Sequence, residues 1–299
     1  MSEVSRQPFF SVMMPVYNHA QFVGPAIESV LAQTFRNWEL VVVNDGSTDG
    51  SGAVIDGYAA KDPRVIAIHQ PNAGEAGARN RALRACRSEW LAFLDSDDLW
   101  YPQTLQHFSD HITARPEATF IHGYRHRLND DGSITESSGE FQDRVTGAAE
   151  LFGRMFLSCL CVCCRRELVE KVGGYDTTLT ISPDYDLYLR MSRHTKFWPM
   201  GKPTGLRRRH ETNISRASGR NRMTHAQILE RFVNDTGGRD LLPPNLIAHR
   251  LSRVYFTAGR EFMREKNNTD AVTALERSLT RQWTLRASLL LAAARLLYR

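Results

Sequence analysis

Four short apolar runs alternate with segments of helical spacing in the N-terminal third of the chain. The runs cover residues 9–14, 39–43, 65–69 and 90–94. Apolar residues at successive positions of so short a run predict strands, and those at 9–14, 39–43 and 90–94 are expected to be buried. Between the runs, apolar residues recur at helical spacing, as at Phe22, Ala26 and Val30. Strands and helices in alternation, joined by short polar loops, predict an α/β fold with a mostly parallel sheet flanked by helices.

Composition is that of a globular protein and argues against a nucleic-acid partner. The 299 residues include 42% hydrophobic and 24% charged side chains, with a net charge of +5. This small positive excess, without a basic patch interleaved with aromatics, does not indicate nucleic-acid binding. The first residues lack the basic-then-apolar pattern of a signal peptide, and no apolar run is long enough to span a bilayer. We therefore expect a cytoplasmic protein.

Each predicted strand is followed by polar residues that suit a ligand site. In parallel sheets ligands bind beyond the carboxyl ends of the strands, so these residues are expected to converge on one rim. In chain order they are Pro15, Tyr17 and Asn18; Asp45, Ser47 and Asp49; Gly74, Arg79 and Asn80; and Asp95, Asp97 and Asp98. Separated acids with one arginine suit a nucleotide and a metal. Asp45 would accept from a base N–H, Arg79 would pair with phosphate, and the last group of acids would bind ribose and a cation.

The acids at 95–98 have two local interpretations. Asp95 and Asp97 are two positions apart at the end of a buried strand and can hold one hard cation between protein and phosphate oxygens. The alternative is a solvated turn in which Asp98 caps a helix. The chain has no G-x-G-x-x-G and no P-loop motif, so phosphates must be neutralised by a metal and an Arg or His. That requirement, together with the other rim loops, favours the cation site.

Four motifs in order give the chain a family resemblance over residues 9–210. VMMPVYN, VVVNDGSTDGS, NAGEAGARNRAL and WLAFLDSDDLWYP resemble the family 2 inverting glycosyltransferases, which have a GT-A fold. The resemblance implies that Asp45 contacts the nucleobase and that Pro15 and Tyr17 border it. It also implies that Arg79 lies near the nucleotide, that Asp95 lies near the ribose, and that Asp97 binds the Mn²⁺ or Mg²⁺ that holds the diphosphate.

A second group of motifs concerns the acceptor side. GGYD at 173–176, followed by SPDYDLYLR at 182–190, resembles the acceptor motif of the same family. The resemblance implies that Asp184 is the catalytic base and that His210 lies near the metal and diphosphate. Pro183 stands where the family usually has Glu, which removes a neighbouring carboxylate. Local chemistry also allows Asp184 to be an acid that suits the start of a helix, with Asp186 as its rival.

The expected organisation has a catalytic domain followed by a helical extension. Residues 1–8 are expected to be disordered and 9–215 to form the GT-A domain, with a nucleotide-binding half at 9–101 and an acceptor half at 102–215. Residues 216–299 are expected to be helical. The cysteine-rich stretch 159–164 is interpreted as a buried strand. From Arg277 onward there are five Arg, no acid and many Leu, which leaves packing on the catalytic domain or a partner, and peripheral membrane contact, as alternatives.

The resemblance implies a metal-dependent inverting glycosyltransferase. Its donor would be a nucleoside-diphosphate sugar, expected to be UDP-linked, and its acceptor a saccharide or a lipid-linked molecule. The expected role is surface polysaccharide synthesis in the cytoplasm, with the inner face of the membrane as the alternative location. Two other functions remain open at this point: a nucleotidyltransferase of the same fold, and a non-catalytic scaffold that binds nucleotide sugars.

Overall fold

The computed structural model describes residues 7–136, 142–208 and 218–297. The chain divides into two compact units. The first comprises Met1–Gly147, Phe156–Leu187 and His194–Glu211, and the second Ala148–Met155, Tyr188–Arg193 and Thr212–Arg299. Of the expected segments, most of 1–8 and the end of 9–215 lie outside the described residues.

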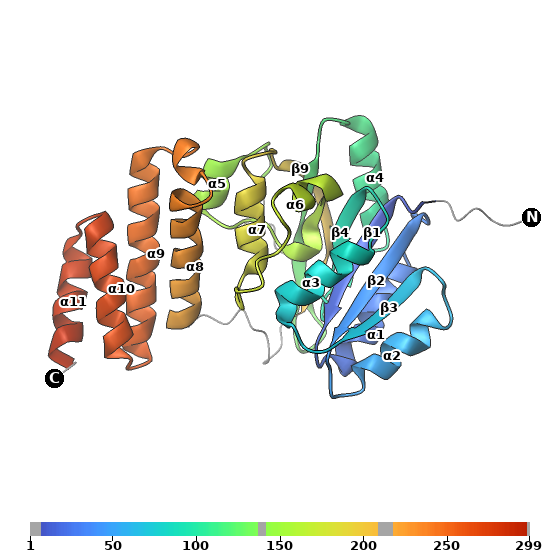
Figure 1. Cartoon of the computed structure of the whole chain (residues 1–299), viewed down its shortest axis with the longest axis horizontal. Helices are drawn as coiled ribbons and strands as arrows, with labels where there is room; N and C mark the ends of the chain where they lie inside the picture. Colours follow the sequence, from blue (N-terminus) through green and yellow to red (C-terminus); the bar gives the residue numbers. More distant parts are fainter. Residues whose placement is uncertain (1–6, 137–141, 209–217, 298–299) are drawn as a thin grey trace, which may run out of the picture. The chain divides into compact units, whose positions relative to one another are not determined.

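A mixed sheet organises the first unit (Figure 1). Its strand order within the described chain is β3-β2-β1-β4-β8-β6-β9-β5, and β7 pairs with β6. The first four strands in this order are mutually parallel, as predicted, and β6 and β9 are also parallel. In chain order the strands are β1 (Phe10–Val16), β2 (Trp38–Asp45), β3 (Val65–Gln70), β4 (Trp90–Phe93), β5 (Leu99–Trp100), β6 (Phe120–Leu128), β7 (Ile134–Thr135), β8 (Val162–Arg165) and β9 (Trp198–Arg208).

The first unit also contains helices, some on each face of its sheet. They are α1 (Ala20–Leu31), α2 (Ser51–Ala59), α3 (Gly74–Ala85), α4 (Thr104–Ala114), α6 (Arg166–Lys171) and the start of α7 (Pro183–Met191). Side chains alternate between faces along a strand. Phe10, Val12 and Met14 of β1 share one core with residues of α1, α2 and α4, whereas α3 packs against β1 and β2 outside that core.

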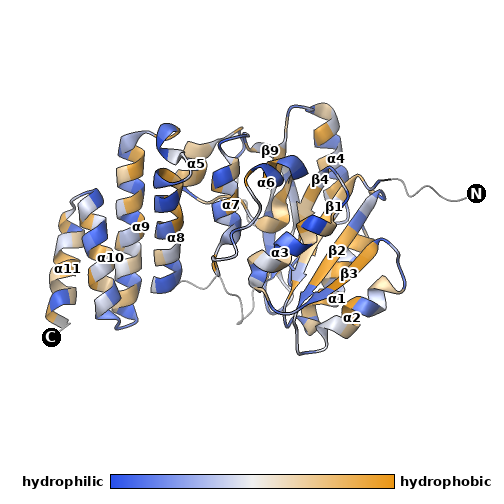
Figure 2. Ribbon diagram, viewed as in Figure 1, coloured by the Kyte–Doolittle hydropathy of each residue, from blue (hydrophilic) through white to orange (hydrophobic). Residues whose placement is uncertain are grey.

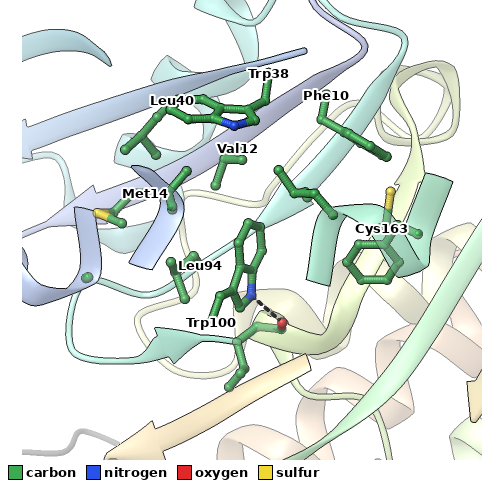
Figure 3. Close-up of a cluster of buried hydrophobic side chains, with 14 of the residues drawn as sticks. Phe10, Val12, Met14, Trp38, Leu40, Leu94, Trp100 and Cys163 are labelled. Carbon is green, nitrogen blue, oxygen red and sulfur yellow. Dashed lines mark hydrogen bonds between the residues drawn. The ribbon is translucent and has the colours of Figure 1, made fainter. Parts of the chain in front are cut away.

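The core on the α1 side is large and aromatic. Figure 3 shows part of it, with Trp38 of β2 and Trp100 of β5 among aliphatic side chains. The indole N–H of Trp100 donates to the carbonyl oxygen of Leu160 at 2.8 Å, so this buried donor is satisfied. Strands β1, β2 and β3 are coloured largely hydrophobic in Figure 2. Strands β1 and β2 are buried along almost their whole length, whereas β3, at the edge of the sheet, is only partly buried.

The cysteine-rich stretch is buried, although only part of it is a strand. Cys159–Cys161 forms a 3₁₀ turn, and β8 begins at Val162. Cys159, Cys161, Cys163 and Cys164 are all buried thiols. Burial raises the pKa of the Cys161 thiol to about 12, so it is neutral at physiological pH. The strand prediction for 159–164 is therefore correct for its second half only.

The second unit is helical within its described residues. Its helices are α5 (Ala148–Gly153), α8 (Gly219–Asn234), α9 (Pro244–Arg264), α10 (Asn268–Arg281) and α11 (Leu285–Leu297), with a 3₁₀ turn at Gly238–Asp240. Phe262 of α9, Leu275 of α10 and Leu291 of α11 share a small core. A Cβ at Gly259 would lie 2.6 Å from Leu275 Cγ, so the missing side chain lets α9 and α10 approach closely at this position. None of the described helices is long and apolar enough to cross a bilayer.

Candidate active site

The loops after β1 and β2 bind each other at the carboxyl end of the sheet. The backbone N–H of Asn18 donates to Ser47 Oγ at 3.0 Å, and Asn18 Oδ1 accepts from the N–H of Thr48 at 2.8 Å. Asn18 has a φ of +52°, a conformation that Asn tolerates better than most residues. The convergence of the first two rim loops, predicted from the sequence, is therefore confirmed.

Pro15 and Tyr17 lie at this rim in different environments. The segment that begins at Pro15 was predicted to be a loop, but β1 continues to Val16 and Pro15 is paired in register with Val43 of β2. Proline is tolerated in this strand although it lacks an N–H for the ladder. Tyr17 follows the strand and is 50% exposed. Its phenol ring is thus accessible to a ligand at the end of β1.

Asp45 ties the second rim loop to the third. Its side chain is 2% exposed, and Oδ1 accepts from Gln70 Nε2 at 2.6 Å and from the N–H of Ala73 at 2.8 Å. The close approach requires Gly46, which has a φ of +73° and where a Cβ would lie 2.7 Å from the nitrogen of Asn72. Asp45 Oδ2 accepts no hydrogen bond from the described residues.

A buried arginine connects three parts of the chain. Arg79 of α3 is 1% exposed, and its Nη2 lies 2.8 Å from Glu75 Oε1 and 2.6 Å from Asp95 Oδ1. Its Nη1 donates to Cys159 Sγ at 2.9 Å. A buried guanidinium needs such partners, because an unpaired charge at this depth would be strongly destabilising. We call Glu75, Arg79, Asp95 and Cys159 the Arg79 cluster.

Asp184 lies within the electrostatic field of the Arg79 cluster. Helix α7 begins at Pro183, and Asp184 Oδ1 accepts the N–H of Tyr185 at 2.9 Å. Burial raises the pKa of Asp184 to about 6, and the charge of Glu75 adds to this effect while Arg79 opposes it. The charge of Asp95 also raises the pKa of Asp184. The structure therefore brings the predicted base near both Arg79 and Asp95. The preceding residue, Ser182, has a φ of +51°, a strained conformation of the kind found at functional sites.

The acids at 95–98 form a turn that β9 holds in place. The N–H of Asp98 donates to the carbonyl oxygen of Asp95 at 3.1 Å. Asp98 Oδ1 accepts the N–H of Arg208 at 2.9 Å, and Arg208 Nε donates to the carbonyl oxygen of Asp97 at 3.2 Å. Burial, with the charges of Asp97 and Asp95, raises the pKa of Asp98 well above its ordinary value. We call residues 95–98 the Asp turn.

The alternative role of Asp98 as a helix cap is wrong. Residues 99 and 100 form β5, and α4 begins only at Thr104. Asp98 is 3% exposed and serves a backbone donor of β9. The helix-cap interpretation failed because a two-residue antiparallel strand has no periodic signal in the sequence.

The donor chemistry of the Asp turn suits a hard divalent cation. The described residues include no group of three metal-binding side chains. Mg²⁺ sites commonly use one or two carboxylates and complete their shell with phosphate oxygens and water. The carboxylate of Asp97, next to Asp95, fits that requirement in combination with a diphosphate. His210 lies outside the described residues.

Two residues that contribute to the site, Glu75 and Arg208, were not assigned a function from the sequence. Glu75 has the (i, i+4) spacing to Arg79 that favours a helical ion pair, and this spacing was a usable signal. Arg208 offered none, because its contact with the Asp turn depends on the pairing of β9 with β5. Tyr185 and Tyr188, which flank Asp186 on α7, are 1% and 0% exposed and belong to the core, so they do not line an open acceptor pocket.

Known proteins resemble this chain in sequence and in fold. The family model described as Glycosyl transferase family 2 matches residues 11–173. The hyaluronan synthase of Pasteurella multocida is 28% identical over 243 residues, which is 79% of this chain and 24% of that protein. The chain spans about a quarter or less of the length of this relative and of two other curated relatives that it matches.

Two solved structures share the fold at 18% identity. One is TarS 1–349 of S. aureus in complex with UDP, with a TM-score of 0.69, covering 96% of this chain and 87% of that one. The other is the mannosyltransferase PcManGT of Pyrobaculum calidifontis with GDP-Man and Mn²⁺, with a TM-score of 0.60, covering 98% and 81%. Both are GT-A glycosyltransferases, so the predicted GT-A fold is confirmed.

Proposed function

The chain belongs to glycosyl transferase family 2, and from this premise we propose that it transfers a sugar from a nucleoside-diphosphate sugar to an acceptor hydroxyl. The observation that carries the proposal is the position of Asp184 in the field of Arg79, Glu75 and Asp95, with its pKa raised to about 6. A carboxylate with this pKa is ionised at neutral pH and is a stronger base than an ordinary Asp. It is therefore suited to take the proton from a sugar hydroxyl.

The nucleotide would occupy the rim formed by the first, second and fourth loops. Tyr17 is exposed beside Pro15 and offers a surface for the base, and Asp45 Oδ2 is available to accept a base N–H. Asp95 would bind the ribose. In this scheme Arg79 is a positioning residue, because its guanidinium is engaged by Asp95 and Glu75 and fixes the orientation of the Asp95 carboxylate.

The chemistry requires one base and a stabilised leaving group. Asp184 would remove the acceptor proton while the hydroxyl oxygen attacks the anomeric carbon, and the nucleoside diphosphate leaves from the opposite face. No protein nucleophile takes part, so the proposed outcome is inversion at the anomeric carbon. A bound Mn²⁺ or Mg²⁺, held by Asp97 and completed by His210, would supply Lewis-acid stabilisation of the diphosphate.

We assign the donor and acceptor by class. One structural neighbour has been solved with UDP and with UDP-GlcNAc, and the other with GDP-Man and Mn²⁺. A UDP-linked sugar is the donor we favour. The hyaluronan synthase among the relatives supports a saccharide or lipid-linked acceptor and a role in surface polysaccharide synthesis. The proposed location is the cytoplasm, with the inner face of the membrane as the alternative.

The decisive experiment separates donor binding from transfer. Nucleotide sugars are first screened with Mn²⁺ for thermal stabilisation of the chain, and the best donor is used in a transfer assay. Asp184→Asn should lower transfer by about a hundredfold to ten-thousandfold while donor stabilisation is retained. The folded-state pKa of Asp184 exceeds the ordinary value of 3.8. Its charge therefore costs stability as pH rises through about 6, and Asn is not expected to destabilise the fold.

Asp186 provides the rival variant on the same helix. If Asp186→Asn abolishes transfer and Asp184→Asn does not, the base is assigned to the wrong residue. If no nucleotide sugar stabilises the chain and none is consumed, the proposed activity itself is wrong. Anomeric configuration of the product, measured by NMR, tests the inversion separately.

A further inference from the structure

The exposed apolar side chains of the second unit gather at its last helix. Among the large hydrophobic residues of the described chain that are exposed, four fall between 283 and 296: Trp283 (69%), Leu285 (61%), Leu289 (63%) and Leu296 (74%). Single exposed hydrophobics are normal on protein surfaces, but a concentration of them marks an interaction site.

These leucines form one stripe along α11. At about 100° per residue, Leu285, Leu289 and Leu296 fall within about 40° of one another around the helix. The opposite face of α11 is covered, since Leu291 and Ala294 belong to the core with α9 and α10. Helix α11 therefore has an inner apolar face that is packed and an outer one that is not. We call Leu285, Leu289 and Leu296 the leucine stripe, which lies on the helix whose mixed hydropathy Figure 2 shows.

Positive charge flanks the leucine stripe on both sides. Arg286 lies about 100° from Leu285 in one direction and Arg295 about 80° in the other. Arg295 pairs with Glu276 at 2.6 Å, whereas no acid among the described residues pairs with Arg286. The chain has no Asp or Glu after residue 277.

We propose that the leucine stripe docks α11 in the plane of an anionic lipid surface. Leucines would enter the boundary between headgroups and acyl chains, and the flanking arginines would meet lipid phosphates while their aliphatic stems cover the margins. Trp283, at the turn before α11, suits the same boundary because tryptophan concentrates at membrane–water interfaces. A lipid surface also supplies a negative partner for Arg286, which pairs with no acid of the described residues, whereas Arg281 and Arg295 pair with Glu230 and Glu276.

Charge separates this occupant from a second copy of the chain. Two α11 helices related by a two-fold axis along the stripe would place the Arg286 margin of each copy against the Arg295 margin of the other, where the acid, Glu276, is already engaged by Arg295. An anionic bilayer has no such conflict. The proposal concerns the second unit alone and is tested without any transfer reaction, so its failure leaves the proposed activity intact.

The test is co-sedimentation of the full chain with vesicles. Vesicles of phosphatidylcholine with added phosphatidylglycerol should retain the chain, those of phosphatidylcholine alone should retain it weakly, and salt should weaken the binding. The double variant Leu289→Gln/Leu296→Gln should lower binding about tenfold or more, and Arg286→Gln severalfold. Ile134→Gln, which removes an apolar side chain that is 51% exposed on β7, is the matched control and should bind as the unchanged chain does.

Two further readouts make the result unambiguous. Trp283 is the most exposed tryptophan, so tryptophan emission should shift to shorter wavelength on anionic vesicles and not in Trp283→Phe. Light scattering measures the mass of the free chain. Absence of binding to either vesicle, equal binding to both, or a dimer that the double variant dissociates would each overturn the proposal; the last result would assign the stripe to a second copy.

Discussion

At the scale of single residues, the site depends on how one buried arginine is shared. Arg79 pairs with Glu75 on its own helix and with Asp95 on the Asp turn. Motifs identified Arg79, Asp95 and Asp184 from the sequence, but not the contacts between them. Such contacts join positions 16 or more residues apart, as between Arg79 and Asp95, and only the tertiary fold sets them. The burial of Arg79 and Cys159 within the cluster could not be read from the sequence either.

The raised pKa of Asp184 predicts a pH dependence of transfer. Because a base must be deprotonated, kcat/KM for the acceptor should fall as pH drops below about 6. The charge of Glu75 raises this pKa, so Glu75→Gln should move the acidic limb of the profile to lower pH. The profile is measured by transfer assays across pH at saturating donor.

An exposed glutamate outside the cluster serves as the control for Glu75. Glu170 pairs with Arg166 on α6 and is 50% exposed, so Glu170→Gln should leave the limb unchanged. If the acidic limb of the pH profile does not move in Glu75→Gln, the charge of Glu75 does not influence the pKa of the catalytic base. A uniform loss of activity at every pH would instead indicate a structural role for Glu75.

At the scale of elements, the sequence predicted the parallel half of the sheet far better than the antiparallel half. The first four strands are short apolar runs, and burial on both faces gives β1, β2 and β4 a clear pattern. In the sequence, TGLRRRH at 204–210 indicates a strand, whereas β9 already begins at Trp198. Pro199, Gly201 and Pro203 conceal its first half, because such residues argue against a strand. Yet β9 provides Arg208, which holds the Asp turn.

The pairing of β9 with β5 yields a prediction at one glycine. A Cβ at Gly205 would lie 2.0 Å from the carbonyl oxygen of Leu99, so Gly205→Ala must separate the two strands next to the Asp turn. We expect a loss of about 1–3 kcal/mol in the free energy of unfolding and weaker donor binding. Chemical denaturation and calorimetric titration with the donor measure the two effects.

Helix α2 offers the matched control for this glycine. A Cβ at Gly57 would meet nothing within 4 Å, so Gly57→Ala should be neutral or stabilising by up to about 1 kcal/mol. If Gly205→Ala loses stability but binds the donor normally, β9 supports the fold without positioning the Asp turn. Full retention of both properties would show that the strands accommodate the methyl group.

At the scale of the whole molecule, the two compact units interleave along the chain. Sequence analysis placed one boundary, after residue 215. The structure assigns Ala148–Met155 and Tyr188–Arg193, from the middle of the chain, to the helical unit. Composition does not distinguish these short segments from their neighbours, because their membership depends on which side chains pack around them. The helical character of the C-terminal residues was predictable, since their apolar residues recur at helical spacing.

Two compact units predict two separable unfolding transitions. Scanning calorimetry of the full chain should resolve them, and donor with Mn²⁺ should raise only the transition of the unit that contains Asp97. Chelation of the metal should reverse that shift.

Leu275→Ala removes a side chain that is fully buried in the helical unit and should lower the transition of that unit, at a cost of about 2–5 kcal/mol. The corresponding variant of the first unit is Leu105→Ala, on α4, whose side chain is equally buried. A single transition that moves with the donor and with both substitutions would mean that the units unfold together, because each perturbation would then act on the same cooperative equilibrium.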